Sequence, residues 1–172
     1  AMLLNKLYIL WHFWRAFFAP AEIYMKILIL MRHGQAEPYA ETDAQRALTP
    51  AGRDKAAATA RTLQKAGYKP AVLLCSPLLR ARQTAQTAGD ILGLAPQAAE
   101  ELDGRLSAKG LIDFAVQQLQ KADCVMLVGH NPNCSIAAGI LREEYTPFEA
   151  GTAAVFDMTD PQTPKFLPTE NK

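Results

Sequence analysis

The sequence predicts an α/β fold: a three-layer α/β/α sandwich with a mostly parallel central sheet. Short apolar runs, typical of strands buried on both faces, alternate along the chain with longer segments of helical character. Strands and helices that alternate in this way form parallel sheets covered by helices on both faces. The length of 172 residues favours one domain with a single core.

The first strand is predicted over residues 27–31, an unbroken run of Ile, Leu, Ile, Leu and Met. Residues 35–47 are polar and irregular, so we expect a loop over the end of this strand. Thr49 and Pro50 are a good helix start, because threonine caps the first turn and proline fits the first helical position. This Ala-rich helix is expected to end just before Gly67.

The second strand is predicted over residues 72–75 and leads through Pro77 into a helix that ends just before Gly93. Residues 100–110 are acidic and are expected to form a loop. A third helix is predicted over residues 111–120, where apolar residues recur with a helical period.

The last predicted elements are a strand over residues 124–128 and a helix over residues 132–142. Residues 152–158 alternate weakly between polar and apolar, which indicates an edge strand. Residues 161–172 contain three prolines and are expected to be an irregular tail. The predicted domain therefore spans residues 25–160.

Three of the predicted strands end in residues suited to binding and attacking an anion. Open α/β sheets bind their ligands at the carboxyl ends of the strands. Arginine grips an oxyanion through its fork of donors, and a neutral histidine supplies a nucleophilic nitrogen. The residues concerned are Arg32, His33 and Gly34 after the first strand, Ser76 and Arg80 after the second, and His130 and Asn131 after the strand predicted over residues 124–128.

These motifs resemble those of the histidine phosphatase superfamily, which includes cofactor-dependent phosphoglycerate mutase. The matching segments, in order, are Arg-His-Gly at 32–34, Leu-Thr-Pro-Ala-Gly at 48–52, Ser-Pro-Leu-Leu-Arg-Ala-Arg-Gln-Thr at 76–84 and Gly-His at 129–130. The third segment is most similar to the SixA-type protein phosphohistidine phosphatases. The resemblance implies a phosphoglycerate mutase-like fold and catalysis through a phosphohistidine on the enzyme.

We expect His33 to be the nucleophile, Arg32 and Arg80 to hold the phosphoryl oxygens, and His130 to donate a hydrogen bond to the same group. Arg82 follows Arg80 by two helical positions and is therefore expected to point away from it. Gly34, Ser76 and Asn131 are candidate substrate-binding residues, although Asn131 also suits a helix cap.

The general acid is not fixed by a motif. Glu101 is our first candidate, and Glu100 and Asp103 are the alternatives in the same acidic loop. Gln35 stands where the family often has an acidic residue. A phosphohistidine substrate relaxes the need for an acid, because protonated imidazole is already a good leaving group. The chain also lacks long insertions that could form a lid, which favours a protein-borne phosphoryl group.

Composition excludes several classes of function. The formal charge of +1 gives no argument for nucleic-acid binding. Cys75, Cys124 and Cys134 fit neither a zinc pair nor a disulfide framework, so we expect reduced thiols, a cytoplasmic location, and neither metal nor cofactor. We expect a monomer.

Residues 1–24 are rich in aromatic residues and also contain Lys6, His12 and Arg15. They fit an extension outside the fold or a helix at a membrane surface better than a signal sequence, and the charges argue against a membrane span. The leading hypothesis is a metal-independent phosphatase of phosphohistidine on partner proteins. The alternatives are a phosphatase of small phosphomonoesters and a non-catalytic phosphoprotein-binding module.

Overall fold

The computed structural model describes residues 24–145 and 147–169 and contains a six-stranded sheet between two layers of helices. The strands are β1 (Ile27–Arg32), β2 (Val72–Cys75), β3 (Gln97–Ala98), β4 (Cys124–Gly129), β5 (Ala153–Asp157) and β6 (Lys165–Leu167). The α-helices in these ranges are α2 (Pro50–Lys65), α3 (Leu79–Leu92), α4 (Ala108–Leu119) and α5 (Asn133–Arg142). Two short 3-10 helices are η1 (Asp43–Gln45) and η2 (Glu100–Leu102).

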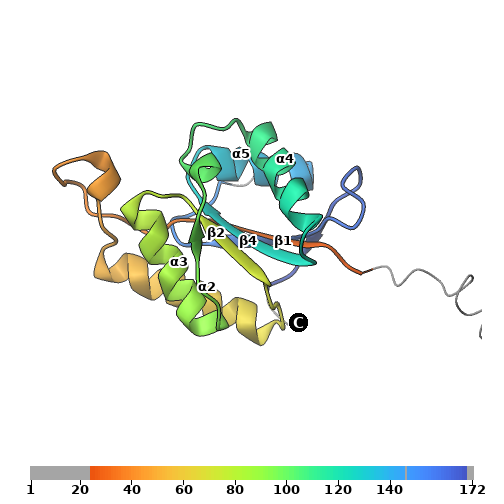
Figure 1. Cartoon of the computed structure of the whole chain (residues 1–172), viewed down its shortest axis with the longest axis horizontal. Helices are drawn as coiled ribbons and strands as arrows, with labels where there is room; N and C mark the ends of the chain where they lie inside the picture. The colour runs from red at the N-terminus through yellow and green to blue at the C-terminus, as the bar shows by residue number, and fades with distance from the viewer. Residues whose placement is uncertain (1–23, 146, 170–172) are drawn as a thin grey trace, which may run out of the picture.

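The sheet is mostly parallel, with strand order β3-β2-β4-β1-β5-β6. The β1, β2, β3 and β4 strands pair in parallel, whereas β5 and β6 join the sheet as antiparallel strands. Helices α2 and α3 cover one face, and α4 and α5 cover the other (Figure 1). The predicted three-layer α/β/α fold is confirmed.

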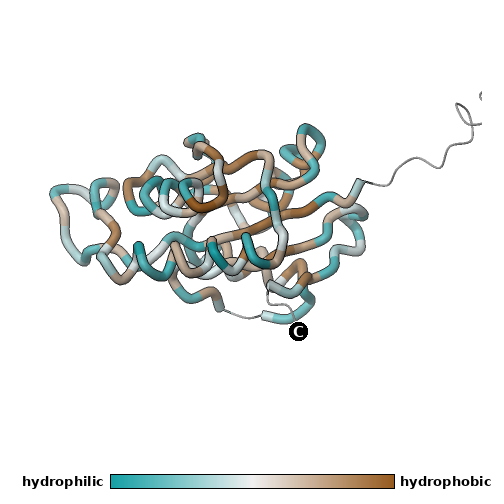
Figure 2. The backbone as a smooth tube through the Cα atoms, turned by 90° about the horizontal axis from the view of Figure 1, so that it is seen from below, coloured by the Kyte–Doolittle hydropathy of each residue, from teal (hydrophilic) through white to brown (hydrophobic). Residues whose placement is uncertain are grey.

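The β1 strand shows why an unbroken apolar run belongs in the middle of such a sheet. Successive side chains point to opposite faces. Leu28 and Leu30 pack in the core on the α4 and α5 side, whereas Ile27, Ile29 and Met31 pack against α2 and α3. Figure 2 shows hydrophobic segments running through the middle of the molecule, with hydrophilic residues on outer turns. Burial of both faces fixes the register of β1 and therefore the position of the residues that follow it.

Local signals place two of the helices as predicted. Thr49 caps α2, and its Oγ1 accepts a hydrogen bond from the Gly52 N–H at 2.9 Å. Helix α3 ends at Gly93, whose φ of 78° is the left-handed conformation that glycine adopts without strain.

The structure also corrects the predictions near the carboxyl terminus. The prediction of an irregular tail is wrong over Lys165–Leu167, because these residues form β6 and pair with β5. For the same reason β5 is not an edge strand, since it lies between β1 and β6. A strand of three residues has too short a pattern to be read from sequence, and its pairing is set by its neighbour in the fold.

The acidic loop is more ordered than expected. Residues Glu100–Leu102 form η2, and α4 begins at Ala108 with Ser107 as its cap, three residues before the predicted start. The two-residue strand β3 was not predicted. In the described part of the chain, no helix is long and apolar enough to cross a bilayer. The hypotheses for residues 1–24 fall on the segment before residue 24, outside the described residues.

Candidate active site

Parallel pairing brings the ends of β1, β2 and β4 into one row. Arg32 lies opposite Gly129, and Cys75 lies opposite Val128. The next residue of each strand therefore projects from the same edge of the sheet. The main chain continues this alignment, because the His33 N–H donates to the Gly129 carbonyl at 3.0 Å. The rings of His33 and His130, which are 97 positions apart in sequence, have centroids 5.0 Å apart.

The hydrogen bond of His33 fixes which ring nitrogen is free. Nδ1 of His33 lies 2.7 Å from the carbonyl oxygen of Gly34. A carbonyl can only accept a hydrogen bond, so Nδ1 carries the hydrogen and Nε2 keeps its lone pair. Burial lowers the pKa of His33 to about 4, and the charges of Arg80, Arg32 and Arg46 act in the same direction. His33 is therefore neutral at pH 7, with an unprotonated Nε2.

The two predicted phosphoryl-binding arginines are both held by the main chain. Nη1 of Arg32 donates to the Phe148 carbonyl at 2.8 Å, and its buried Nε has no hydrogen-bond partner among the described residues. Arg80 is buried, and its Nη1 donates to the main-chain carbonyl of Asp43 at 2.8 Å. A buried donor without a partner is costly in a folded protein, so the Nε of Arg32 marks a place where an anion would be stabilised.

His130 is held by Ser76, which is completely buried. The Oγ of Ser76 lies 2.7 Å from Nε2 of His130 and accepts the N–H of Leu78 at 3.2 Å. The Ser76 hydroxyl can donate its hydrogen to Nε2, and in the tautomer that accepts it the hydrogen of His130 is on Nδ1. Burial lowers the pKa of His130 to about 4, and the nearby His33 and Arg80 lower it as well. His130 is thus also neutral at pH 7.

The three candidate substrate-binding residues make supporting contacts in this structure. The Gly34 N–H donates to the Oγ1 of Thr84 at 2.9 Å. Gly34 also approaches Gly52 closely, since a Cβ at position 34 would lie 2.6 Å from the Gly52 carbonyl oxygen. The hydroxyl of Ser76 contacts Nε2 of His130. Asn131 bridges the start of α5 to the following loop, donating to the Phe148 carbonyl at 3.2 Å and accepting from the Ser135 hydroxyl at 2.9 Å.

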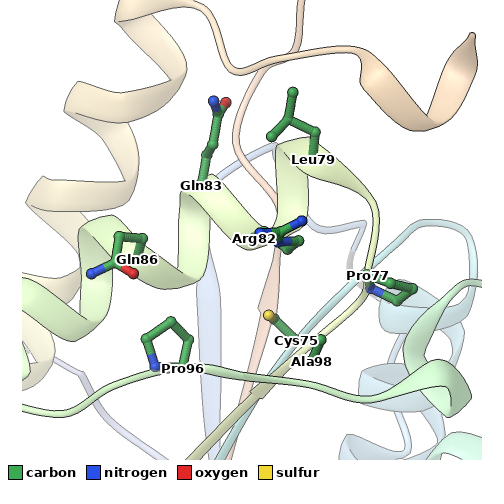
Figure 3. Close-up of a pocket in the computed structure, with 8 residues that line it drawn as sticks. All are labelled: Cys75, Pro77, Leu79, Arg82, Gln83, Gln86, Pro96 and Ala98. Atoms are coloured by element: carbon green, nitrogen blue, oxygen red, sulfur yellow. The ribbon is translucent and has the colours of Figure 1, made fainter.

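Arg82 lies apart from Arg80, as its helical position predicts. Its side chain is exposed and lines a separate surface pocket of about 430 Å³ between α3 and the segment that leads to β3. Figure 3 shows Arg82 beside Cys75 and Pro77, with Gln83 and Gln86 along the same helix. Arg80 is not among the residues that line this pocket.

The three candidate acids differ in environment. Glu100 and Glu101 are exposed, and Glu101 lines a small hollow that His130 also lines. Asp103 forms an ion pair with Arg105. Hydrogen bonds from the main chain and side chain of Arg105 lower the pKa of Asp103, which keeps this carboxyl group ionised at neutral pH. Asp103 is therefore poorly suited to donate a proton.

Two charged residues at the site were not predicted from the sequence, in which residues 35–47 indicate only a polar loop. Asp43 accepts hydrogen bonds from Arg80, and Arg46 pairs with the same Asp43 carboxylate at 3.2 Å. The only signal in the sequence is an acid and a base three positions apart. That spacing is typical of a surface ion pair and does not indicate a contact with a helix 37 residues away.

Comparisons with known proteins point to one family. The family described as the histidine phosphatase superfamily (branch 1) matches residues 28–106. The phosphohistidine phosphatase SixA of Escherichia coli (strain K12) is 32% identical over 136 residues, which are 77% of this chain and 84% of that protein. An uncharacterized protein of Picosynechococcus sp. is 38% identical over 111 residues, which are 62% of this chain and 67% of that protein.

Solved structures agree with the sequence comparison. The structure of the protein histidine phosphatase SixA complexed with tungstate has a TM-score of 0.71 and 27% identity, and covers 83% of this chain and 94% of its own. A putative phosphohistidine phosphatase SixA from Agrobacterium tumefaciens has a TM-score of 0.73 and 25% identity, and covers 83% and 96%.

Proposed function

Because this chain belongs to the histidine phosphatase superfamily, we propose that it removes phosphoryl groups from histidine side chains of partner proteins through a phosphohistidine on its own His33. One observation carries the proposal: His33 is neutral with a free Nε2, and it lies among two arginines and a second neutral histidine. A neutral imidazole is the form that can attack phosphorus. Cationic groups around it neutralise the phosphoryl charge.

In the first step, Nε2 of His33 attacks the phosphorus atom of the substrate. A bond forms between Nε2 and phosphorus, the bond from phosphorus to the leaving atom breaks, and the leaving atom takes the electron pair. The His33 ring gains positive charge, which the Gly34 carbonyl stabilises through the hydrogen bond at Nδ1. Arg32 and Arg80 hold the phosphoryl oxygens, and His130 donates a hydrogen bond to the same group.

In the second step, water attacks the phosphorus atom of the phosphorylated His33. An oxygen–phosphorus bond forms, the bond to Nε2 breaks, and the electron pair returns to Nε2. One water hydrogen stays on the new oxygen, and the other passes to a phosphate oxygen. His33 is neutral again and ready for another cycle. The charge is supplied by side chains, so the scheme uses no metal ion and no cofactor.

The substrate class follows from the leaving group. When an alkyl phosphate is cleaved, its alcohol leaves as an alkoxide unless an acid protonates the oxygen. When a phosphohistidine protonated on its other ring nitrogen is cleaved, the imidazole leaves as a neutral molecule. Asp103 is kept ionised by Arg105, and Glu100 and Glu101 are exposed to water. This set of acids suits a leaving group that needs no further proton, and we therefore propose phosphohistidine as the substrate.

A phosphatase of small phosphomonoesters is the second candidate. It is supported by Glu101, which shares a hollow with His130 and could protonate an ester oxygen there. A purely binding function is less well supported, because a binding module has no need of a neutral histidine with a free nitrogen. Free cysteines at positions 75, 124 and 134 fit a reducing compartment, and we propose that the protein acts in the cytoplasm.

The test is a parallel assay of the full chain on a chemically phosphorylated histidine peptide and on a panel of phosphomonoesters, with His33→Ala as the inactive control. Higher kcat/KM on the phosphohistidine peptide supports the proposal. Higher kcat/KM on one of the phosphomonoesters favours the second candidate. Absence of turnover on every substrate, with binding of the phosphopeptide retained, would support the binding module instead.

A further inference from the structure

Asp43, in the loop between β1 and α2, accepts hydrogen bonds from Arg80 through both its main chain and its side chain. Nη1 of Arg80 donates to the carbonyl oxygen of Asp43 at 2.8 Å, and Nη2 donates to the carboxylate Oδ2 of Asp43 at 3.0 Å. The other carboxylate oxygen, Oδ1, accepts from Nη1 of Arg46 at 3.2 Å. The Asp43 carboxylate therefore joins two guanidinium groups, one of which belongs to the candidate active site.

The loop is built to bring Asp43 to this place. Its two ends pair where Ala36 bridges to Leu48 and the Glu37 N–H donates to the Ala47 carbonyl at 2.8 Å. Nε of Arg46 donates to the Glu37 carbonyl at 2.9 Å and so ties the returning part of the loop to the outgoing part. Figure 1 shows the closed loop, which carries η1, projecting to one side of the sheet beyond the end of β1.

Arg46 is also part of the electrostatic environment of the nucleophile. Its charge is close enough to lower the pKa of His33, together with the charges of Arg80 and Arg32. Two acceptors fix its guanidinium group: the Glu37 carbonyl at Nε and the Asp43 carboxylate at Nη1. Arg46 is therefore a third cation near His33, and its position depends on Asp43.

We propose that Asp43 is a positioning residue for phosphoryl binding, because its carboxylate holds the guanidinium groups of Arg80 and Arg46 together. An arginine has five N–H donors, and Arg80 uses one on each Nη for Asp43. Three donors remain for phosphoryl oxygens. The inference rests on the proposed function for the identity of the anion.

The opposite interpretation is that the Asp43 carboxylate occupies the anion position and competes with the phosphoryl group. Two observations favour positioning over competition. The main-chain carbonyl of Asp43 also accepts a hydrogen bond from Arg80, so part of this contact does not depend on the charge of the Asp43 carboxylate. The buried donor without a partner among the described residues is Nε of Arg32, so an anion position remains open while Asp43 is in place.

The substitution Asp43→Asn is suited to test this proposal, because it should leave the fold intact. The Asp43 side chain is 63% exposed, and the substitution keeps the main-chain carbonyl that accepts a hydrogen bond from the buried Arg80. Asn keeps the main-chain contact and the size of the side chain but loses the charge that pairs with both arginines. Asp113→Asn is a matched control, since Asp113 also pairs with a cation, Lys109, on the exposed surface of α4.

The experiment measures the binding of inorganic phosphate to the full chain by calorimetry. Asp43→Asn should weaken phosphate binding roughly tenfold, as expected for loss of a hydrogen-bonded charge pair. Asp43→Glu should recover part of this loss, and Asp113→Asn should bind within about twofold of wild type. The double variant Asp43→Asn with Arg46→Gln should lose less affinity than the two single losses combined. In steady-state assays, KM should rise more than kcat falls.

Unchanged or tighter phosphate binding in Asp43→Asn would overturn the proposal, and tighter binding would support competition. Full additivity of the Asp43 and Arg46 substitutions would also overturn it, since the two residues would then act independently. Phosphate binding needs no turnover. The result for Asp43 is therefore distinguishable from a failure of the proposed function, which the wild-type assays and His33→Ala test separately.

Discussion

Acidification should leave His33 neutral far below the pH at which a histidine ordinarily gains its proton. Burial lowers its pKa to about 4, and the surrounding arginine charges contribute to this shift. At about pH 5.5, a histidine with this pKa is about 97% neutral, whereas one with the ordinary pKa of 6.5 is about 9% neutral. The fraction of nucleophile in the reactive form at that pH should therefore be about tenfold higher than for an ordinary histidine.

Imidazole titration by NMR measures this fraction directly. The chain has three histidines, His12, His33 and His130, so three sets of ring signals are expected. The His33→Ala and His130→Ala variants each remove one set and so assign the spectrum. We expect two signals, from His33 and His130, to titrate near pH 4. Because the charge of His33 lowers the pKa of His130, the His33→Ala variant should raise the midpoint of His130.

The same shifts predict how stability depends on pH. Between about pH 4 and pH 6.5, the unfolded chain binds protons at His33 and His130 that the folded protein does not bind. The free energy of unfolding should therefore fall as the pH is lowered through this window. Urea unfolding should show a smaller loss in His33→Ala than in wild type. Midpoints near pH 6.5 for both histidines would refute the description of a buried, cation-lined site.

Three further predictions concern the site. Glu101→Gln should reduce kcat on phosphomonoesters on the order of a hundredfold and should change kcat on a phosphohistidine peptide little. A large loss of kcat on the peptide would contradict a site that needs no general acid. Ser76→Ala should lower kcat at least several-fold, because His130 loses the hydroxyl that lies 2.7 Å from its Nε2. Circular dichroism checks that the fold is retained. An unchanged kcat would show that Ser76 does not position His130. Activity should persist after exhaustive treatment with EDTA, since arginines supply the positive charge; a loss reversed by one added divalent metal would contradict this assignment.

Much of the fold could be predicted because β1 and β4 are buried on both faces. Such strands must be apolar throughout, so residues 27–31 and 124–128 stand out in the sequence. Parallel pairing then brings His33 and His130 to one edge, as inferred from the strand ends. The β6 strand could not be predicted, because Lys165 and Phe166 are exposed and only pairing with β5 defines it.

The parts of the site that could not be predicted depend on contacts between distant segments. Ser76 follows a strand and suits substrate binding by sequence, but in the fold its hydroxyl lies behind His130, 54 positions away. Asp43 and Arg46 form an ordinary charge pair by spacing, and only the fold brings Arg80 to the same carboxylate. A single polar side chain leaves no repeating pattern in the sequence that would identify its partner. These contacts can therefore be found only from the three-dimensional structure.

In the proposed mechanism a phosphoryl group is carried on Nε2 of His33. Rapid quenching during turnover of a phosphohistidine substrate labelled in its phosphoryl group, followed by peptide mapping under alkaline conditions, tests it most directly. We expect label on the peptide that contains His33, formed faster than inorganic phosphate is released, and none in His33→Ala. Label on His130 instead, or steady turnover with no labelled enzyme at any time, would contradict it.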